Sequence, residues 1–197
     1  MSKAKETKEK IIKQAAQLFN QYGYTGSSIS DIMRATSLQK GGIYNHFQNK
    51  QELALAAFDF ASGQSSKYLL MAIKGKHNAV ERLQAILSVF RNLVNDPPIA
   101  GGCPILNTAV ESDDTNPALR DRTQKAMDTW RNLICRIINK GISKGELRST
   151  IEADTVASIM ISTLEGAVMM SKLYGNSIHM ERAIDHLNEY IENNLQV

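Results

Sequence analysis

The 197-residue sequence has few of the residues that mark several protein classes. Its two cysteines, Cys103 and Cys135, are too few for a disulfide framework, so a reduced, cytoplasmic setting is the simplest expectation. No run of 18 apolar residues occurs, which argues against a membrane-spanning helix. Polar residues interrupt the first apolar cluster, at 11–19, which argues against a signal peptide.

Motifs of the common enzyme classes are also absent. The four histidines (His46, His77, His179 and His186) do not have the H-E-x-x-H spacing of a zinc site. No G-x-S-x-G motif, phosphate-binding loop or dinucleotide fingerprint is present. An enzyme is the first alternative to be weighed, but the sequence shows no catalytic constellation. We therefore expect no enzymatic activity, no metal and no cofactor.

The charge is distributed unevenly, although the formal net charge of the chain is only +3. The first 50 residues hold eight basic and three acidic side chains, a net charge of +5, and the remainder holds 15 basic and 17 acidic ones, a net charge of −2. A basic N-terminal segment beside a near-neutral body is typical of a protein whose one end meets phosphate groups.

Apolar residues recur at helical spacing almost throughout, and strand-like alternation is scarce, so the sequence predicts an all-α fold. Ser27 or Ser28 is expected to cap the second helix, and Thr150 or Asp154 the eighth. The irregular stretch at 92–117 is expected to hold a short helix at about 105–111. The predicted helices are 5–22, 28–36, 39–47, one from about 50, 79–95, 105–111, 117–141, 152–174 and 180–195.

The second and third predicted helices are short, are joined by a tight turn at Ser37–Leu38, and have a helix before and after them. This arrangement is a helix-turn-helix, here from about Ser28 to Phe47, whose second helix lies in the major groove of DNA. Ile43 and Phe47, four residues apart, are expected to anchor that helix to its own core. Its other face is short, polar or glycine, as the groove requires.

Gly41 and Gly42 stand inside this short helix and together cost it about 1–2 kcal/mol of helix propensity. One explanation is that the backbone approaches a phosphate or a base edge closely at this point. The other explanation is that the pair eases the preceding turn.

At these residues the sequence resembles the TetR family of bacterial regulators, over about residues 8–55 and without gaps. The run through Tyr44, His46–Phe47 and Lys50 is the most specific part, and Gly42 is often another small residue in the family. The matching residues are Ile11-Ile12, Ala15-Ala16, Leu18-Phe19, Gly23-Tyr24, Ser27-Ser28-Ile29, Asp31-Ile32, Ala35, Lys40-Gly41-Gly42-Ile43-Tyr44-Asn45-His46-Phe47 and Lys50-Gln51-Glu52-Leu53.

The resemblance implies a homeodomain-like three-helix head over 1–50, a linker helix from about 50, and a helical effector-binding and dimerisation body over 51–197. It also implies a ligand-responsive repressor that binds a palindromic operator in double-stranded DNA as a homodimer and leaves it when a small effector binds. The expected location is the cytoplasm, at the bacterial nucleoid. Activation instead of repression, and a helical interaction protein that has lost DNA binding, are the alternatives.

The resemblance assigns DNA contacts position by position. Serine hydroxyls at the start of the second helix would bind phosphate. Gln39 and Lys40 would reach base edges, and Tyr44 and Lys50 would contact phosphates. Asn45 would read a base or bind the backbone, and His46 would contact the backbone or pack in the head. Arg34, Lys5 and Lys8 are weaker candidates. The predicted set is Ser27, Ser28, Gln39, Lys40, Gly41, Gly42, Tyr44, Asn45, His46 and Lys50.

In the body, the helices at about 152–174 and 180–195 are expected to pair with their copies in a dimer. Small residues at Ser158, Ser162, Gly166 and Ala167 would permit close packing there, although packing within one subunit is the alternative. The residues of the effector pocket could equally be ordinary core. The predicted pocket set is Phe60, Phe90, Cys103, Leu106, Asn107, Met127, Trp130, Glu165 and Met169, with Met71, Glu111 and Tyr174 as further candidates.

Cys103 lies in Gly101-Gly102-Cys103-Pro104, which resembles a segment of related regulators that sense electrophiles or oxidants. A thiol near a helix N-terminus has a lowered pKa and can react. The alternative is that Cys103 is a small buried hydrophobe. Cys135, on an apolar helical stretch, is expected in the core.

Overall fold

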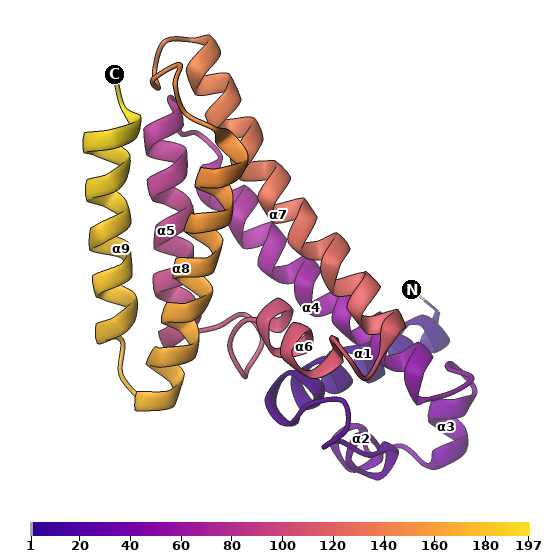
Figure 1. The fold of residues 1–197 in the computed structure, drawn as a ribbon. Helices are drawn as coiled ribbons and strands as arrows, with labels where there is room; N and C mark the ends of the chain where they lie inside the picture. Colours follow the sequence, from indigo (N-terminus) through magenta and orange to yellow (C-terminus); the bar gives the residue numbers. More distant parts are fainter. Residues whose placement is uncertain (1) are drawn as a thin grey trace. The chain divides into compact units, whose positions relative to one another are not determined.

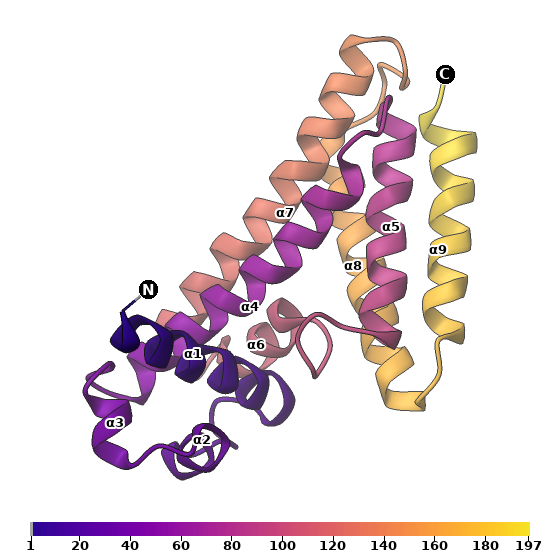
Figure 2. The same ribbon diagram turned by 180° about the vertical axis from the view of Figure 1, so that it is seen from behind.

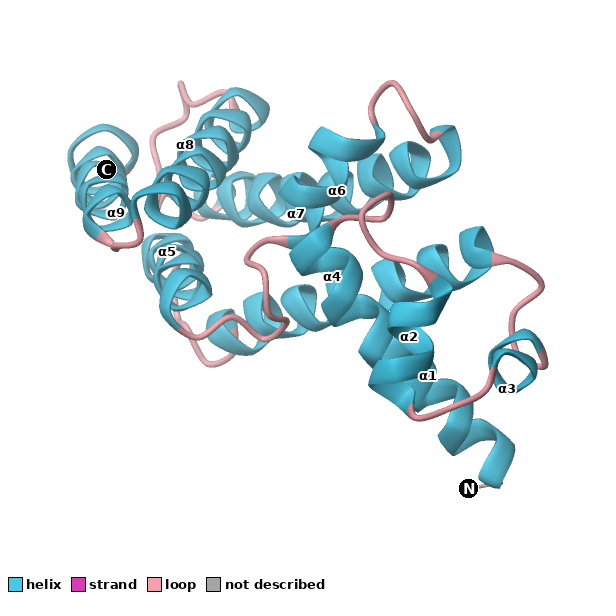
Figure 3. Cartoon of the chain, turned by 90° about the horizontal axis from the view of Figure 1, so that it is seen from below, coloured by secondary structure: helices cyan, strands magenta, loops and turns pink. Residues whose placement is uncertain are grey.

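Residues 2–197 are described by the computed structural model, and their regular secondary structure is helical, apart from one isolated bridge between Leu147 and Gln196. Figure 3 shows helices joined by loops, as the all-α prediction requires, so that prediction is confirmed. The elements are α1 (Lys3–Tyr22), α2 (Ile29–Thr36), α3 (Lys40–Tyr44), α4 (Lys50–Ile73), α5 (Ala79–Asn95), α6 (Pro104–Ser112), α7 (Pro117–Ser143), α8 (Ala153–Tyr174), α9 (Ile178–Tyr190) and a π-helical turn at Ile191–Leu195.

Local signals in the sequence set most helix boundaries. Ser28 caps α2, and its side chain and that of Asp31 each accept a backbone N–H of the other residue, which is a capping box. Gly23 and Gly175, which have positive φ angles, follow α1 and α8. The cap of α8 was predicted wrongly. Glu152 holds that position and accepts the N–H groups of Asp154 and Thr155, which fall just inside the helix.

The chain divides into two compact units of packing. The head unit runs to Gln64 and also includes Pro98–Ala126, and the body unit consists of Ser65–Pro97 and Met127–Val197. The head unit therefore contains α6 and the first part of α7 in addition to the predicted helix-turn-helix. The functional boundary predicted near residue 50 remains a prediction, because a unit of packing need not coincide with a unit of function.

The head unit is built around one apolar cluster. Its members come from α1, α2, α3, the start of α4 and the segment before α6, so each short helix contributes to the same core. Helices as short as α2 and α3 are marginal alone in water, and tertiary burial supplies their stability. The buried members are Ile11, Ala15, Ala16, Ile32, Ile43, Phe47, Leu53, Ala57, Ala61 and Ile99.

In the body unit, α5, α8 and α9 lie side by side (Figures 1 and 2), and α9 packs on both α8 and α5. Within residues 2–197, α8 alone is long and apolar enough to cross a membrane, with a mean hydropathy of 1.3 over its most apolar window. Half of that window is buried in the protein, so packing in a helical core accounts for its composition.

The tight crossing of α7 on α5 leaves no room for a side chain at Gly141. Gly63, which lies in open space, provides the control. A Cβ at Gly141 would lie 2.5 Å from the Cβ of Ala79, whereas a Cβ at Gly63 in α4 would meet nothing within 4 Å. We expect Gly141→Ala to lower the free energy of unfolding by about 1–3 kcal/mol through overpacking. We expect Gly63→Ala to raise it by about 0.5–1 kcal/mol through helix propensity. Urea unfolding followed by circular dichroism measures both, and equal changes would refute this packing.

Candidate nucleic-acid interface

The two serines before α2 differ in what they can reach. Ser28 is exposed, and its hydroxyl donates to the carboxylate of Asp31 at 2.6 Å. The hydrogen bonds from Ser28 hold the pKa of the Asp31 carboxyl below its usual 3.8. Ser27 is buried, and its hydroxyl lies 2.8 Å from the Gly23 carbonyl and 3.3 Å from that of Leu18. The hydroxyl of Ser27 is therefore used inside the head and, contrary to the prediction, is not placed to bind a phosphate.

One face of α3 is buried and the opposite face is open. Ile43 and Phe47 are 0% and 2% exposed and pack into the head core, as their spacing predicts. Gly42 and His46 are partly exposed. The other predicted contact residues of this segment are exposed, namely Gln39, Lys40, Gly41, Tyr44 and Asn45. The ammonium of Lys40 lies 5.8 Å from the centre of the Tyr44 ring, so the two side chains share one side of the helix.

The surroundings of the glycine pair test one of its two explanations, that it eases the turn. Neither Gly41 nor Gly42 has a positive φ, and the left-handed residue of the turn is Ser37, with φ 57°. A Cβ at Gly41 would meet nothing within 4 Å, and one at Gly42 would make an ordinary contact, 3.6 Å, with Leu38. Neither the turn nor the packing of this chain requires a glycine at these positions. The explanation that the pair eases the turn is therefore not supported, and close approach of a phosphate or a base edge remains a prediction.

Lys50, at the first position of α4, has an internal partner. Its ammonium donates to the Tyr24 carbonyl and lies 4.2 Å from the centre of the Tyr24 ring. Partial burial lowers the pKa of Lys50, and the nearby carboxylates of Glu111 and Asp31 oppose that shift. An ammonium has three N–H donors, so this bond leaves others for a phosphate. The predicted phosphate contact of Lys50 remains a prediction.

The loop that leads into α2 is held by a carboxylate from α6. Glu111 accepts the backbone N–H of Tyr24 at 2.7 Å and that of Thr25 at 2.8 Å. A Cβ at Gly23, where φ is +79°, would lie 3.0 Å from the Glu111 oxygens, so a side chain would crowd this contact. Burial, with a smaller contribution from Glu111, raises the pKa of Tyr24. Glu111 therefore positions the start of the helix-turn-helix.

A second polar contact joins α1 to the segment that begins α6, and we call its three residues, Asn20, Gly101 and Asn107, the amide clasp. The Asn107 amide nitrogen lies 2.9–3.0 Å from the Asn20 side-chain oxygen and from the Asn20 and Gly101 carbonyls. Asn20 donates in turn to the carbonyls of Ala100 and Gly102. A Cβ at Gly101 would lie 2.5 Å from the Asn20 carbonyl oxygen, so only glycine fits.

These connections were not predicted. Asn107 and Glu111 were expected to orient an effector, but the Asn107 amide nitrogen binds α1 and the Glu111 carboxylate binds the loop before α2. Asn20 could have been found, because it is a polar residue on the apolar face of α1, four positions after Ala16. The reciprocal amide pair of Gln51 and Asn116, at 2.9 and 3.0 Å, has no signal in the sequence, because the two lie 65 residues apart.

The predicted effector residues are divided between the two units. Phe60, Cys103, Leu106 and Asn107 lie in the head unit, and Phe90, Met127, Trp130, Glu165 and Met169 lie in the body unit. In the body unit the rings of Phe90 and Trp130 meet edge to face, 5.6 Å between centres, and the indole N–H of Trp130 donates to Ser66. Met169 is 54% exposed on α8.

Cys103 is completely buried and occupies the N-cap position of α6. It therefore lies at a helix N-terminus, as predicted, but no solvent reaches the thiol in this structure. Cys135 is partly buried, and burial, with the Asp154 carboxylate, raises the pKa of its thiol. A nearby cavity in the head unit, between α1, α4 and α6, holds about 30 Å³, which is far smaller than a typical ligand site. In residues 2–197 no group of three or more His, Cys, Asp or Glu side chains is arranged to hold a metal.

Two family profiles match the chain. Residues 11–57 match the profile described as "Bacterial regulatory proteins, tetR family", and residues 79–187 match "Tetracyclin repressor-like, C-terminal domain". The first profile covers α2, α3 and the start of α4 with Lys50, and the second profile covers α6 and most of the body unit.

Solved structures and curated relatives agree with these profiles. A TetR transcriptional regulator from Chloroflexus aurantiacus is 46% identical over the full length of both chains, with a TM-score of 0.98. A TetR-family regulator from Cytophaga hutchinsonii is 33% identical over 100% of this chain and 98% of its own, with a TM-score of 0.91. The HTH-type transcriptional repressor DhaR of Mycobacterium sp. (strain GP1) is 24% identical over 86% of this chain and 84% of its own.

The amide clasp predicts a large effect of one side chain. Asn107→Ala leaves the acceptors on Asn20 and Gly101 without their shared donor, so we expect the free energy of unfolding to fall by about 2 kcal/mol. Asn139→Ala, at an exposed position of α7, is the matched control and should change it by less than about 0.5 kcal/mol. Urea unfolding of both variants measures this, and a harmless Asn107→Ala would show that the clasp does not hold the head unit together.

Proposed function

Because this chain belongs to the TetR family, it is a DNA-binding transcription regulator with a ligand-binding C-terminal region and not an enzyme, and we propose that it represses transcription by placing α3 in the major groove of a palindromic operator. The observation that carries this proposal is the open face of α3. Within residues 2–197 neither the φ angles nor the packing of its two glycines requires glycine, while Ile43 in α3 and Phe47 just after it hold the helix by its other face.

Exposure supports the proposed contacts on DNA. Gln39 and Lys40, at the exposed start of α3, are proposed to read base edges. We expect the Tyr44 hydroxyl and the Lys50 ammonium to bind phosphates, which position the protein without reading sequence. Ser28 would join them only after its hydroxyl, which donates to Asp31 in the free protein, turns toward the DNA. The backbone N–H groups at the start of α2, next to Ser28, are also expected to favour a phosphate. Asn45 and His46 lie beside these groups at the end of α3.

We also propose that the protein acts as a homodimer through α8 and α9. An apolar surface is open along these helices, and a second copy would cover it; its exposed members are Ile159, Met169, Met170, Leu173, Tyr174 and Ile178. Ser158, Ser162 and Gly166 lie partly or fully exposed on α8 and would allow close approach, whereas Ala167 is buried within the subunit. A two-fold dimer presents two α3 helices, which is why the operator is expected to be palindromic.

Release from DNA is proposed to follow binding of a small effector in the C-terminal region, which changes the setting of α4 and hence of the helix-turn-helix. Such an effector must bind the DNA-free state more tightly than the DNA-bound state, since equal affinity moves no population. A movement of α6 would also reach the helix-turn-helix, because Glu111 and the amide clasp attach α6 to the loop before α2 and to α1. The cytoplasm is the proposed location.

The proposal makes Gly41→Ala an informative variant. A methyl group there meets open space in the free protein, so stability should stay the same or rise by up to about 1 kcal/mol. On DNA the same methyl group occupies the space of close approach, and we expect affinity for the operator to fall about tenfold or more, about 1.4 kcal/mol. Gel-shift titration with DNA upstream of the protein's own gene measures this, with Gly63→Ala as the control that should bind normally. Unchanged affinity of the Gly41→Ala variant for the operator would contradict the placement of α3 in the major groove.

The dimer surface predicts a difference between two equally exposed apolar residues. Leu173 on α8 is 75% exposed and Val110 on α6 is 72% exposed. We expect Leu173→Glu to convert the protein into monomers, because a charge would be buried without a partner in the interface. Val110→Glu should leave the dimer intact. Sedimentation velocity at micromolar concentration measures both, and a dimeric Leu173→Glu would place the interface elsewhere.

A further inference from the structure

An open pocket in the body unit is rich in positive charge, and none of the contacts proposed above involves it. It holds about 330 Å³, within the range of small-molecule sites. Its walls come from the end of α4, the loop that follows, the first turn of α5 and the second half of α7, all within the body unit. We call this the cationic pocket, and its lining residues are Ile73, Lys74, Gly75, Arg82, Leu133, Arg136, Ile137 and Lys140.

Four of these eight residues are basic and none is acidic. Among the ion pairs formed within residues 2–197, none involves Lys74, Arg82, Arg136 or Lys140. Concentrating four like charges is unfavourable unless an anion neutralises them. Within residues 2–197, the positive charge of this pocket is therefore not neutralised by an ion pair.

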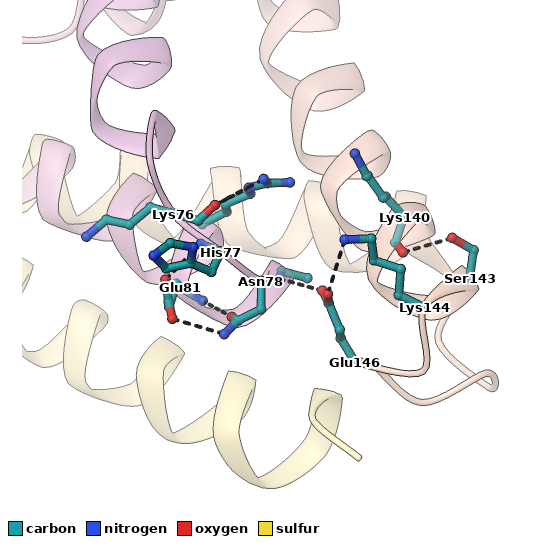
Figure 4. Close-up of polar contacts among 10 residues, drawn as sticks. Lys76, His77, Asn78, Glu81, Lys140, Ser143, Lys144 and Glu146 are labelled. Atoms are coloured by element: carbon teal, nitrogen blue, oxygen red, sulfur yellow. Dashed lines mark hydrogen bonds and ion pairs between the residues drawn. The ribbon is translucent and has the colours of Figure 1, made fainter.

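The neighbouring carboxylates are engaged elsewhere, as Figure 4 shows. Glu81 accepts the backbone N–H of His77 at 2.9 Å and the side-chain amide of Asn78 at 3.0 Å. Glu146 accepts the N–H of Ala79 at 2.8 Å and pairs with Lys144 at 3.6 Å. Both carboxylates thus cap the start of α5 or tie it to the end of α7, and neither lines the pocket.

Both guanidinium groups are held in place by the protein. Arg82 donates through two nitrogens to the Lys76 carbonyl, at 3.2 and 3.0 Å, and Arg136 donates through one nitrogen to the Asn132 carbonyl at 3.2 Å. Each keeps further N–H donors, since a guanidinium has five. An arginine that is already oriented loses less conformational entropy when it binds an anion.

Helix electrostatics does not explain this cluster. Lys140 lies in the last turn of α7, where a cation is favourable. Arg82 lies in the first turn of α5, where the helix dipole disfavours a cation, and Arg136 lies in the interior of α7. The helix dipole therefore does not account for the positions of Arg82 and Arg136.

From these observations we infer that the cationic pocket binds a small amphiphilic anion, with a carboxylate or phosphate monoester against the basic side chains and a short hydrocarbon part against Ile73, Leu133 and Ile137. The apolar residues form one part of the lining, and Ile137 is 6% exposed. A fully polar ion such as inorganic phosphate would leave that apolar surface wet. The anion and its apolar part together match the pocket, and the inference does not depend on DNA binding.

Isothermal titration calorimetry of the full-length protein at low salt tests this, with octanoate, octyl phosphate, 1-octanol and inorganic phosphate as probes. We expect saturable binding of octanoate or octyl phosphate, one per chain, and the comparison of the two shows which head group the site prefers. Octanol and inorganic phosphate should bind at least about tenfold more weakly, because each lacks one half of the recognised chemistry. Failure of both octyl anions to bind, or equal binding of octanol, overturns the inference.

Variants connect the binding to the pocket. Arg136 and Lys140 are exposed, so Arg136→Gln and Lys140→Gln should fold normally, and each should weaken binding of the octyl anion about tenfold. Lys67→Gln removes the same charge at an exposed position of α4 outside the pocket and should bind as the parent does. If the double variant Arg136→Gln/Lys140→Gln binds the octyl anion as tightly as Lys67→Gln, the anion lies elsewhere and the inference is wrong.

Discussion

Burial of Ile43 and Phe47 in the head core is the constraint on which the proposed DNA-reading surface depends. α3 has only five residues, too few to be helical alone in water, and no side chain caps its start. The two apolar side chains fix both its existence and its rotation about its own axis. Because they point inward, Lys40, Gly41 and Tyr44 point outward. A substitution that loosens either anchor would therefore disturb base reading without touching DNA.

Polar contacts join α6 to α1 and to the loop before α2, whereas α1, α2 and α3 are held together by an apolar core. Glu111 holds two backbone N–H groups of the loop before α2, and the amide clasp holds the end of α1. Hydrogen bonds of this kind are directional, so a small displacement of α6 breaks them, whereas an apolar contact yields gradually. This property suits a protein that switches between two conformations. The close contacts also explain why Gly23 and Gly101 are glycines, since a side chain at Gly23 would displace Glu111 and one at Gly101 would displace Asn20.

Much of the fold could be predicted because it rests on local signals. The helix at 79–95 has the predicted bounds, and the capping box at Ser28 marks α2 in the sequence itself. The candidate interface was predicted less completely. The open face of α3 follows from helical spacing, but the burial of Ser27 does not, because the Gly23 and Leu18 carbonyls that bind its hydroxyl are positioned by the turn. The effector residues were chosen by residue type, and type alone does not separate a pocket from a core.

The sequence by itself determined that the chain is helical, where most helices begin and end, and which short helix presents glycine and polar side chains. These properties depend on neighbours within about four residues along the chain. Only the tertiary structure decided that Asn107 and Glu111 serve the head, that Gly41 is not needed by the turn, and that four basic residues from two distant segments share one pocket. Such facts depend on contacts between residues tens of positions apart, which no local pattern records.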